Sequence, residues 1–276
     1  MHILRLDTIH PIISGNKLFK LYYFLKQAGA NSDKAILTFG GAYSNHLSAT
    51  AFACFQLNIK SIGIVRGEKP VVLSHTLIEC ERYGMQLIFI SRETYNNKNE
   101  KDFFNRIKLD TSNCIIIPEG GYHPLGAKGA ALIMDNIPEN NFTHICTSVG
   151  TATTLAGILL SKKNNQQVIG FNALKGINDI NKRIEFLTGT VNYHYDIIDN
   201  YTFGGYAKKT NELIDFMNTL WRDHSIPTDF VYTGKMLFGI FNLIQKEYFP
   251  AASKILTIHT GGLQGNKSLP KGTLTF

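Results

Sequence analysis

The sequence predicts an α/β fold built on parallel β-sheets. Short runs of apolar and β-branched residues recur along the 276-residue chain. Most of these runs are apolar throughout, which is typical of strands buried on both faces. The segments between them can each hold a helix, and such alternation favours parallel sheets covered by helices. At about 150 residues per domain, the length suits one large domain or two lobes.

The expected elements follow one another in a regular order. Strands are expected at 35–39, 61–65, 87–90, 115–117, 144–147, 168–171 and 254–258. Helices are expected at 71–84, 126–136, 154–163 and 207–223, and another should run from about Lys17 to Gly29. No internal repeat and no Pro-, Gly- or Ser-rich linker is evident, so the pattern alone places no boundary between lobes.

The composition indicates a globular protein of the cytoplasm. Hydrophobic residues make up 44% of the chain and charged residues 18%, which excludes disordered and collagen-like classes. No apolar run reaches the roughly 18 residues that cross a bilayer, and the first residues lack a secretory signal pattern. The four cysteines form no CxxC pair, so we expect free thiols in a reducing compartment and no metal site.

The net charge of +7 is compatible with nucleic acid or with small anions. A nucleic-acid surface usually shows a clustered basic stripe, whereas the basic residues here are scattered. The nearest approaches to a cluster are the pairs Lys162-Lys163 and Lys208-Lys209. We therefore expect neither a nucleic-acid nor a membrane partner, and a basic nucleic-acid binder remains only an alternative.

Four junctions that follow expected strands are rich in glycine and small polar residues. They lie at 40–46, 118–124, 148–154 and 259–262. Ligands of parallel sheets gather at the carboxyl ends of the strands, so these junctions are the candidate binding segments.

The 148–154 junction suits a phosphate group. Small residues lead into an expected helix, whose first amides and positive dipole favour an anion. The alternative is simple capping of that helix by Thr151 or Thr153. The segment matches neither the Walker A pattern nor the GxGxxG fingerprint.

Two further candidates come from the first fifty residues. At 40–46, Ser44 or Asn45 is expected to cap a helix and could also face a ligand carboxylate, and the alternative is a turn and cap alone. Lys17 begins an expected helix, where a desolvated amine would have a lowered pKa and become a nucleophile. The alternative is an exposed lysine, and Lys20 is the rival candidate. His46 alone is weak evidence for a catalytic base.

Several motifs in the same order resemble one family. Gly15-Asn16-Lys17-x-x-Lys20-Leu21 is similar to the Schiff-base lysine motif of D-cysteine desulfhydrases and 1-aminocyclopropane-1-carboxylate (ACC) deaminases. Matching segments follow in order, namely Gly40-Gly41-x-x-Ser44-Asn45-His46, His-Pro-Leu-Gly at 123–126, Gly205-Tyr206, Val231-Tyr232-Thr233-Gly234-Lys235 and His259-Thr260-Gly261-Gly262. The resemblance spans nearly the whole chain and implies a fold-type II enzyme dependent on pyridoxal 5'-phosphate (PLP).

The resemblance also implies a role for each matching residue. The expected catalytic residues are Lys17, Ser44, Tyr206 and Tyr232, and the expected cofactor-binding residues are Lys17, Asn45, Gly150, Thr151, Ala152, Thr153, Thr154 and Thr260. Lys17 would carry PLP, and residues 150–154 would bind its phosphate. Asn45 would form a hydrogen bond with the ring hydroxyl, and Thr260 with the pyridine nitrogen. Ser44 would contact the substrate carboxylate or help proton transfer, and the two tyrosines would line the substrate pocket.

The family contains two reactions, and residue 233 bears on the choice between them. ACC deaminases carry glutamate at the third position of the Val-Tyr-x-Gly-Lys motif, facing the pyridine nitrogen, and this chain has Thr233. A neutral hydroxyl suits α,β-elimination from D-cysteine or a related β-substituted D-amino acid, which makes the protein a lyase. The alternatives are ACC deamination to 2-oxobutanoate and ammonia, a hydrolase reaction, or a PLP-binding protein without turnover.

The resemblance further implies two three-layer α/β/α lobes with mostly parallel sheets and the cofactor between them. A smaller lobe at 35–125 would be inserted into a larger one formed by 1–34 and 126–276. We expect a homodimer. The lysine motif lies nearer the start of this sequence than in the family, and we expect this difference to bear on substrate specificity.

Overall fold

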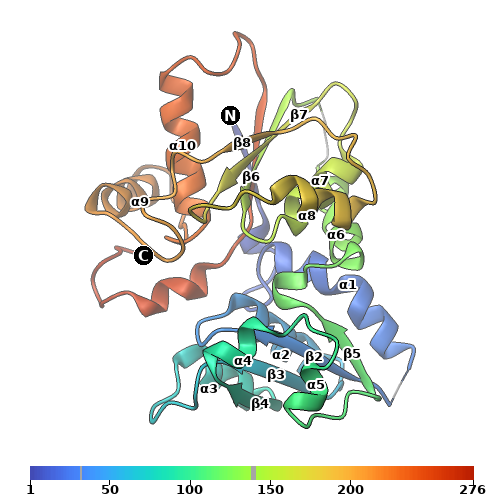
Figure 1. Ribbon diagram of the computed structural model, residues 1–276. Coiled ribbons are helices and arrows are strands. Elements are labelled where there is room, and N and C mark those ends of the chain that lie inside the picture. Colours follow the sequence, from blue (N-terminus) through green and yellow to red (C-terminus); the bar gives the residue numbers. More distant parts are fainter. Residues whose placement is uncertain (32, 138–140) are drawn as a thin grey trace.

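The computed structural model describes residues 1–31, 33–137 and 141–276, and it contains two parallel sheets (Figure 1). The smaller sheet has the strand order β4-β3-β2-β5. Its strands are β2 (Ala35–Gly40), β3 (Ser61–Arg66), β4 (Met85–Ile90) and β5 (Cys114–Ile117). Every pair of neighbouring strands in it is parallel.

The larger sheet combines both ends of the chain. Its strand order is β1-β9-β6-β7-β8, and all its neighbouring strands are also parallel. The strands are β1 (His2–Arg5), β6 (His144–Val149), β7 (Gln167–Asn172), β8 (Asp196–Ile198) and β9 (Ile255–His259). The predicted α/β class with parallel sheets is confirmed.

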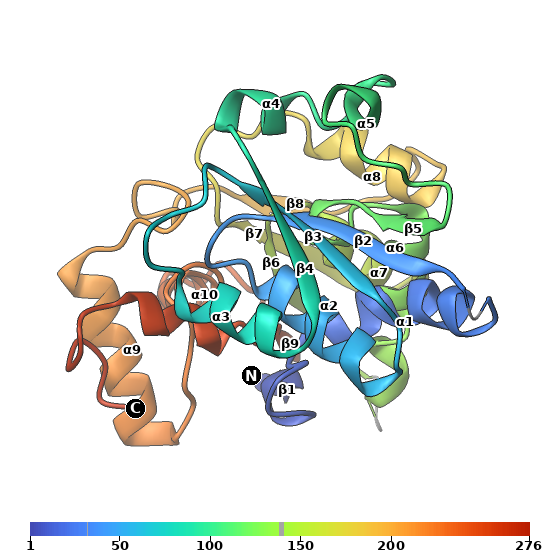
Figure 2. The same ribbon diagram turned by 90° about the horizontal axis from the view of Figure 1, so that it is seen from below.

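Helices cover both sheets (Figure 2). In the first half of the chain they are α1 (Asn16–Gly29), α2 (Asn45–Gln56), α3 (His75–Arg82), α4 (Arg92–Asn96), α5 (Phe103–Arg106) and α6 (Pro124–Ala131). In the second half they are α7 (Thr153–Ser161), α8 (Ile180–Thr188), α9 (Asn211–His224) and α10 (Thr233–Gln245). None of the helices among the described residues is long and apolar enough to cross a membrane.

Helix α1 packs against the cores of both sheets. Leu21, Phe24 and Ala28 recur at helical spacing, are buried, and belong to the apolar cluster around β2, β5 and α2. Phe19 belongs instead to the cluster around the larger sheet. Because α1 joins the two cores, its first turn lies where the sheets approach each other. The lobe boundaries at residues 35 and 125 stay a prediction.

The structure differs from the sequence prediction at several elements. Strands β1 and β8 were not predicted, since each is short and mixes charged with apolar residues. The helix expected over 126–136 is α6 followed by a separate 3₁₀ turn at Met134–Asn136. The helix expected over 71–84 is shorter, because Ser74 caps α3 with a side-chain hydrogen bond from Leu77 N.

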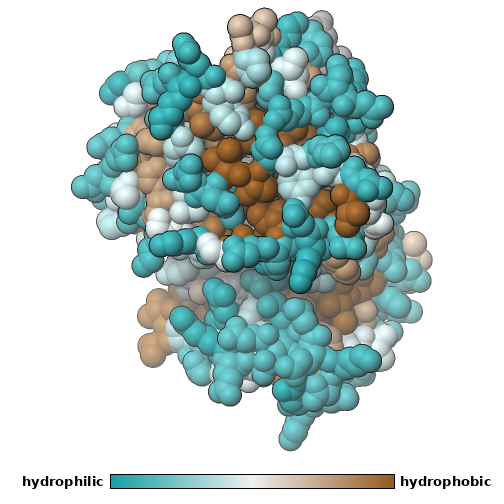
Figure 3. Space-filling model, turned by 45° about the horizontal axis from the view of Figure 1, so that its top comes forward, coloured by the Kyte–Doolittle hydropathy of each residue, from teal (hydrophilic) through white to brown (hydrophobic). Residues whose placement is uncertain are grey.

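The face drawn in Figure 3 is mostly hydrophilic, with an apolar patch near its middle. Cys54, Cys80 and Cys146 are buried, and Cys114 is partly buried, all as free thiols. No second copy of the chain is described, so the expected homodimer stays a prediction.

Candidate active site

The four glycine-rich junctions meet where the two sheets face each other. The segments after β2 and β5 belong to the smaller sheet, and those after β6 and β9 to the larger sheet. Asn45 Nδ2 donates to Gly262 O at 3.2 Å, which joins the 40–46 and 259–262 segments. A methyl group added at Gly120 would lie 2.8 Å from Thr151 Cγ2, so the other two segments are also in contact. The predicted junctions therefore form one site.

The first turn of α1 is held against this site by its backbone. Gly15 has a φ of +72°, and a Cβ there would lie only 1.9 Å from Thr260 O. Only glycine fits such a close approach. Asn16 N donates to Thr260 O at 3.2 Å, and Asn16 Nδ2 donates to Thr154 Oγ1 at 2.7 Å. These contacts place Lys17 between the ends of β6 and β9.

Two lysine amines lie close together in the site. Lys17 Nζ donates to Asn16 Oδ1 at 2.8 Å, and burial lowers the pKa of Lys17 to about 8, an effect that the charge of Asp229 partly offsets. Burial lowers the pKa of Lys20 well below its usual value, and the charge of Lys17 lowers it further. Lys20 Nζ donates to Gly120 O at 3.2 Å. A neutral Lys17 amine near pH 8 is a competent nucleophile.

The segment 150–154 leads into α7 through a left-handed residue. Ala152 is the N-cap, with a φ of +65° and no side-chain cap, so the alternative of capping by Thr151 or Thr153 is wrong. Those two hydroxyls instead lie 2.9 Å apart from each other. The amides of the first helical turn thus keep no side-chain acceptor and can receive an anion.

The 40–46 segment presents one free hydroxyl and one unpaired amide oxygen. Ser44 is the N-cap of α2 and accepts from Leu47 N at 3.2 Å, which agrees with the expected cap. Its hydroxyl hydrogen has no acceptor among the described residues and is free for a ligand. The buried Oδ1 of Asn45 also lacks a partner among them.

His46 is not suited to be a catalytic base. Thr38 Oγ1 donates to Ile117 O, so it must accept from His46 Nε2 at 2.9 Å, which leaves the lone pair on Nδ1. Burial, together with the charges of Lys17 and Lys20, lowers the pKa of His46 to about 3. The ring is therefore neutral near pH 7 and can accept a hydrogen bond without taking up a proton.

The two predicted tyrosines lie next to each other beside the 150–154 segment. The ring centroids of Tyr206 and Tyr232 are 6.3 Å apart. A Cβ added at Gly150 would lie 3.1 Å from Tyr232 Cε1, so this ring covers the start of the 150–154 segment. Burial raises the pKa of both phenols, and the charges of Asp229 and Glu119 act in the same direction. Both side chains are protonated near pH 7 and can donate.

Asp229 is a buried carboxylate of the site that the sequence reasoning missed. Its Oδ1 accepts from Thr233 N and Oγ1 at 2.9 and 2.7 Å, and its Oδ2 accepts from Val231 N and Tyr232 N at 2.9 Å. The hydroxyl of Thr233, which stands where ACC deaminases carry glutamate, thus donates to Asp229. An aspartate four residues before a threonine at a helix start was the available signal.

Thr260 remains in place to contact a ligand. Its side chain is buried, and its Oγ1 lies 3.1 Å from Ser148 Oγ. Because either hydroxyl can be the donor, Thr260 can still donate to or accept from a neighbouring group.

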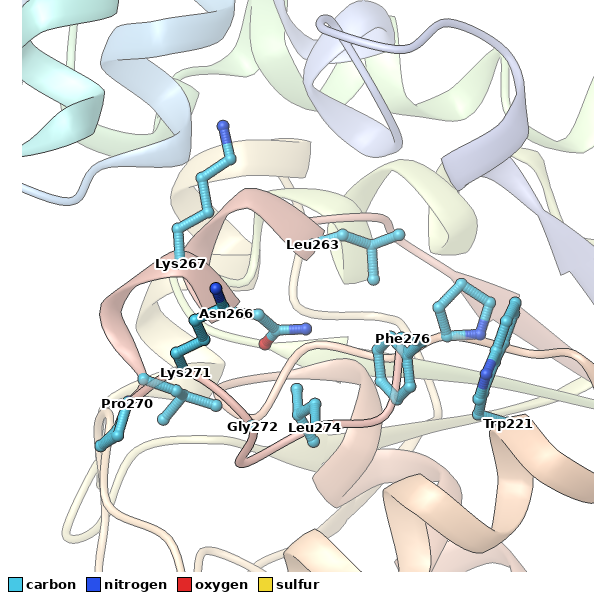
Figure 4. A pocket seen from close by; sticks show the side chains of 11 residues that line it. Trp221, Leu263, Asn266, Lys267, Pro270, Lys271, Gly272, Leu274 and Phe276 are labelled. Atoms are coloured by element: carbon cyan, nitrogen blue, oxygen red, sulfur yellow. The ribbon is translucent and has the colours of Figure 1, made fainter.

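A separate cavity lies away from these residues. It has a volume of about 680 Å³ and is formed by α9 and the C-terminal segment, with Trp221, Leu274 and Phe276 on its wall (Figure 4). None of the predicted site residues lines it. The site residues predicted from the sequence therefore lie at the junctions and not in this cavity.

Comparison with known proteins identifies the class. Residues 3–261 match the family described as pyridoxal-phosphate dependent enzyme. The chain belongs to this family, and its cofactor is PLP.

Individual relatives are similar over most of their length. A bifunctional D-cysteine desulfhydrase/ACC deaminase of Arabidopsis thaliana is 29% identical, over 92% of this chain and 70% of the relative. A Thermotoga maritima protein, named provisionally as an ACC deaminase, is 28% identical over 96% of this chain and 89% of its own. The crystal structure of an ACC deaminase homologue has a TM-score of 0.78 and 26% identity, over 96% of this chain and 85% of that one.

More distant structures share the fold alone. An O-acetylserine-dependent cystathionine β-synthase of Helicobacter pylori has a TM-score of 0.67 at 14% identity, over 97% of this chain and 89% of that one. The expected fold-type II architecture is thus confirmed.

Proposed function

We propose that this PLP-dependent enzyme carries out α,β-elimination on a small amino acid, with D-cysteine as the favoured substrate. One D-cysteine and one water would give pyruvate, ammonia and hydrogen sulfide. The observation that carries the proposal is the desolvated amine of Lys17, in a site that also contains an uncapped helix start and two protonated phenols. The name of the Arabidopsis thaliana relative includes D-cysteine desulfhydrase, which supports D-cysteine as a candidate substrate, and it includes ACC deaminase as well.

The chain's own residues fit the cofactor. The amides of residues 151–154 and the threonine hydroxyls would hold its phosphate, and Lys20 Nζ would supply a hydrogen-bond donor beside them. The second hydrogen of Asn45 Nδ2 is free to donate to the ring hydroxyl, and Thr260 would bond the pyridine nitrogen. The unpaired polar atom of Asn45 and the uncapped amides of α7 are what a site built for a polar ligand requires.

Lys17 has two tasks in this scheme. Its Nζ would hold the cofactor in the resting enzyme, and its free amine would accept the proton from the substrate Cα. When bound, PLP supplies an electron sink for the charge left on Cα. A pKa of about 8 leaves a useful fraction of Lys17 neutral near physiological pH, which both tasks need.

The remaining groups orient the substrate and its leaving group. Ser44 would donate its free hydroxyl hydrogen to the substrate carboxylate at the start of α2, where the helix dipole also favours an anion. Tyr206 or Tyr232 would donate a proton to the departing sulfur, because both phenols are protonated near pH 7.

ACC deamination is the second candidate function. Two observations favour it: the relatives named for that reaction, and the carboxylate of Asp229 inside the site. However, Asp229 already accepts four hydrogen bonds, so its carboxylate would act as a fixed charge and not as a partner of the pyridine nitrogen. We therefore rank elimination first.

The test is a substrate panel on purified protein loaded with PLP. D-cysteine, L-cysteine, D-serine and ACC are offered in parallel, with the keto acid product measured and Lys17→Ala as the inactive control. Pyruvate from D-cysteine would support the proposal, and turnover of ACC alone would reverse the ranking. Bound PLP with no turnover of any compound would favour a non-catalytic carrier.

Residue 233 is a poor probe of this choice. Thr233→Glu would bury a second carboxylate beside Asp229 and disrupt the start of α10. Thr260→Glu would put a carboxylate nearer the expected ring nitrogen. If ring protonation decides the reaction, that change should raise the ratio of ACC to D-cysteine turnover, and an unchanged ratio would contradict this reasoning.

A further inference from the structure

Lys235 is a buried lysine that none of the roles above uses. It lies on the first turn of α10 and is 2% exposed. Its Nζ donates to Thr202 O at 2.8 Å and to Gly205 O at 2.6 Å. No carboxylate forms an ion pair with it in the part of the chain that the structure describes. A buried amine needs hydrogen-bond acceptors, so these two carbonyls are what stabilise Lys235 inside the protein.

The two carbonyls belong to one loop, and that loop has a demanding backbone. Gly204 and Gly205 have φ values of +90° and +111°, but Phe203 and Ala207 also have positive φ, at +49° and +53°. A non-glycine residue in the left-handed region is conformationally strained. Such a conformation persists only where surrounding contacts enforce it.

Helix α10 supplies these contacts. Besides the two bonds of Lys235, the rings of Phe203 and Phe238 pack edge to face at 5.0 Å, and Tyr201 Oη donates to Asn242 Oδ1 at 2.7 Å. The loop is therefore attached to successive turns of one helix, with Lys235 nearest the site.

The loop leads directly to Tyr206, while Tyr232 is the N-cap of α10 itself. The two rings adjoin, with centroids 6.3 Å apart. One helix thus fixes both tyrosines, Tyr232 through its own start and Tyr206 through the bonds from Lys235. Burial lowers the pKa of Lys235 to about 8. A neutral amine still has two N–H groups, enough for both carbonyls.

We propose that Lys235 is a positioning residue that holds the 202–206 loop and thereby keeps the Tyr206 phenol beside Tyr232 at the substrate pocket. The role of Tyr206 toward substrate rests on the proposed function, whereas the fixing of the loop does not. The alternative is that Lys235 only contributes to stability, with no specific link to Tyr206.

The first test measures the loop itself. Amide hydrogen exchange is compared between the wild type, Lys235→Met and the control Lys246→Met, which changes an exposed lysine at the end of the same helix. We expect faster exchange across 202–207 in Lys235→Met alone, with α7 and β6 unchanged and PLP still bound. Unchanged exchange in the loop would overturn the proposal. This arm needs no substrate, so it stands apart from the proposed function.

The second test is a double-mutant cycle of Lys235→Met and Tyr206→Phe, read as kcat/KM with the active compound of the panel. A misplaced catalytic group can cost about 100-fold, so we expect Lys235→Met to lower kcat/KM by about 10- to 100-fold in the wild type. In the Tyr206→Phe background, Lys235→Met should lower kcat/KM by less than about threefold, because the phenol that Lys235 positions is already gone. Equal losses in both backgrounds would show a merely structural role and overturn the link to Tyr206.

Discussion

Replacement of Asp229 by asparagine changes the charge beside Lys17 with almost no change in shape. The carboxylate accepts four hydrogen bonds, three of them from the backbone N–H groups of Val231, Tyr232 and Thr233. An asparagine amide nitrogen cannot accept, so at least one buried N–H loses its partner. This costs about 1–3 kcal/mol, which corresponds to a fall in Tm of about 2–12 °C for a protein of this size.

The same change should alter the reactivity of Lys17. In the wild type, the rate of PLP capture by the apoprotein should rise with pH and level off above about 8, where Lys17 becomes neutral. The negative charge of Asp229 raises the pKa of Lys17, so its removal should lower that pKa. The midpoint of the capture curve should therefore move to lower pH.

The assay combines thermal melting of the apoprotein with the visible absorbance of captured PLP across a pH series. Asp215→Asn, an exposed change on α9, is the control and should leave both readings within error. A midpoint that moves to higher pH in Asp229→Asn, or an unchanged Tm, would refute the reasoning.

Other predictions concern the support of the lysine. Gly15→Ala should abolish PLP binding and cost well over 1–3 kcal/mol of stability, because its Cβ would meet Thr260 O. Gly29→Ala, with no atom within 4 Å, is its control in a melting experiment, and an equal loss in both would contradict the prediction. Thr154→Val removes the hydroxyl that accepts from Asn16 Nδ2, and it should weaken PLP affinity by about tenfold in a titration. An unchanged affinity would show that this hydrogen bond does not support the lysine segment.

The parts of the fold that were predictable are those with a strong local pattern. Strands β2, β3, β6 and β9 are apolar runs buried on both faces, and such runs reveal themselves in the sequence. Strands β1 and β8 have four and three residues and include charged or polar side chains, so only pairing within the sheet makes them strands.

The candidate site was predictable at its strand ends and less so elsewhere. The glycine-rich junctions mark the carboxyl ends of parallel strands, and the structure joins them as that rule requires. Asp229 and Lys235 were missed because their importance depends on the partners that folding brings, a helix start and a distant loop. The N-cap at Ala152 was also unforeseen, since a left-handed alanine leaves no signal in the sequence.

The most direct test of the account is the identity of the residue that carries PLP. The loaded protein is reduced with borohydride, digested, and its peptides are mapped by mass spectrometry. We predict a pyridoxyl group on Lys17, and loss of the visible absorbance in Lys17→Ala. A pyridoxyl group on Lys20, or a Lys17→Ala protein that keeps the absorbance, would contradict the central claim.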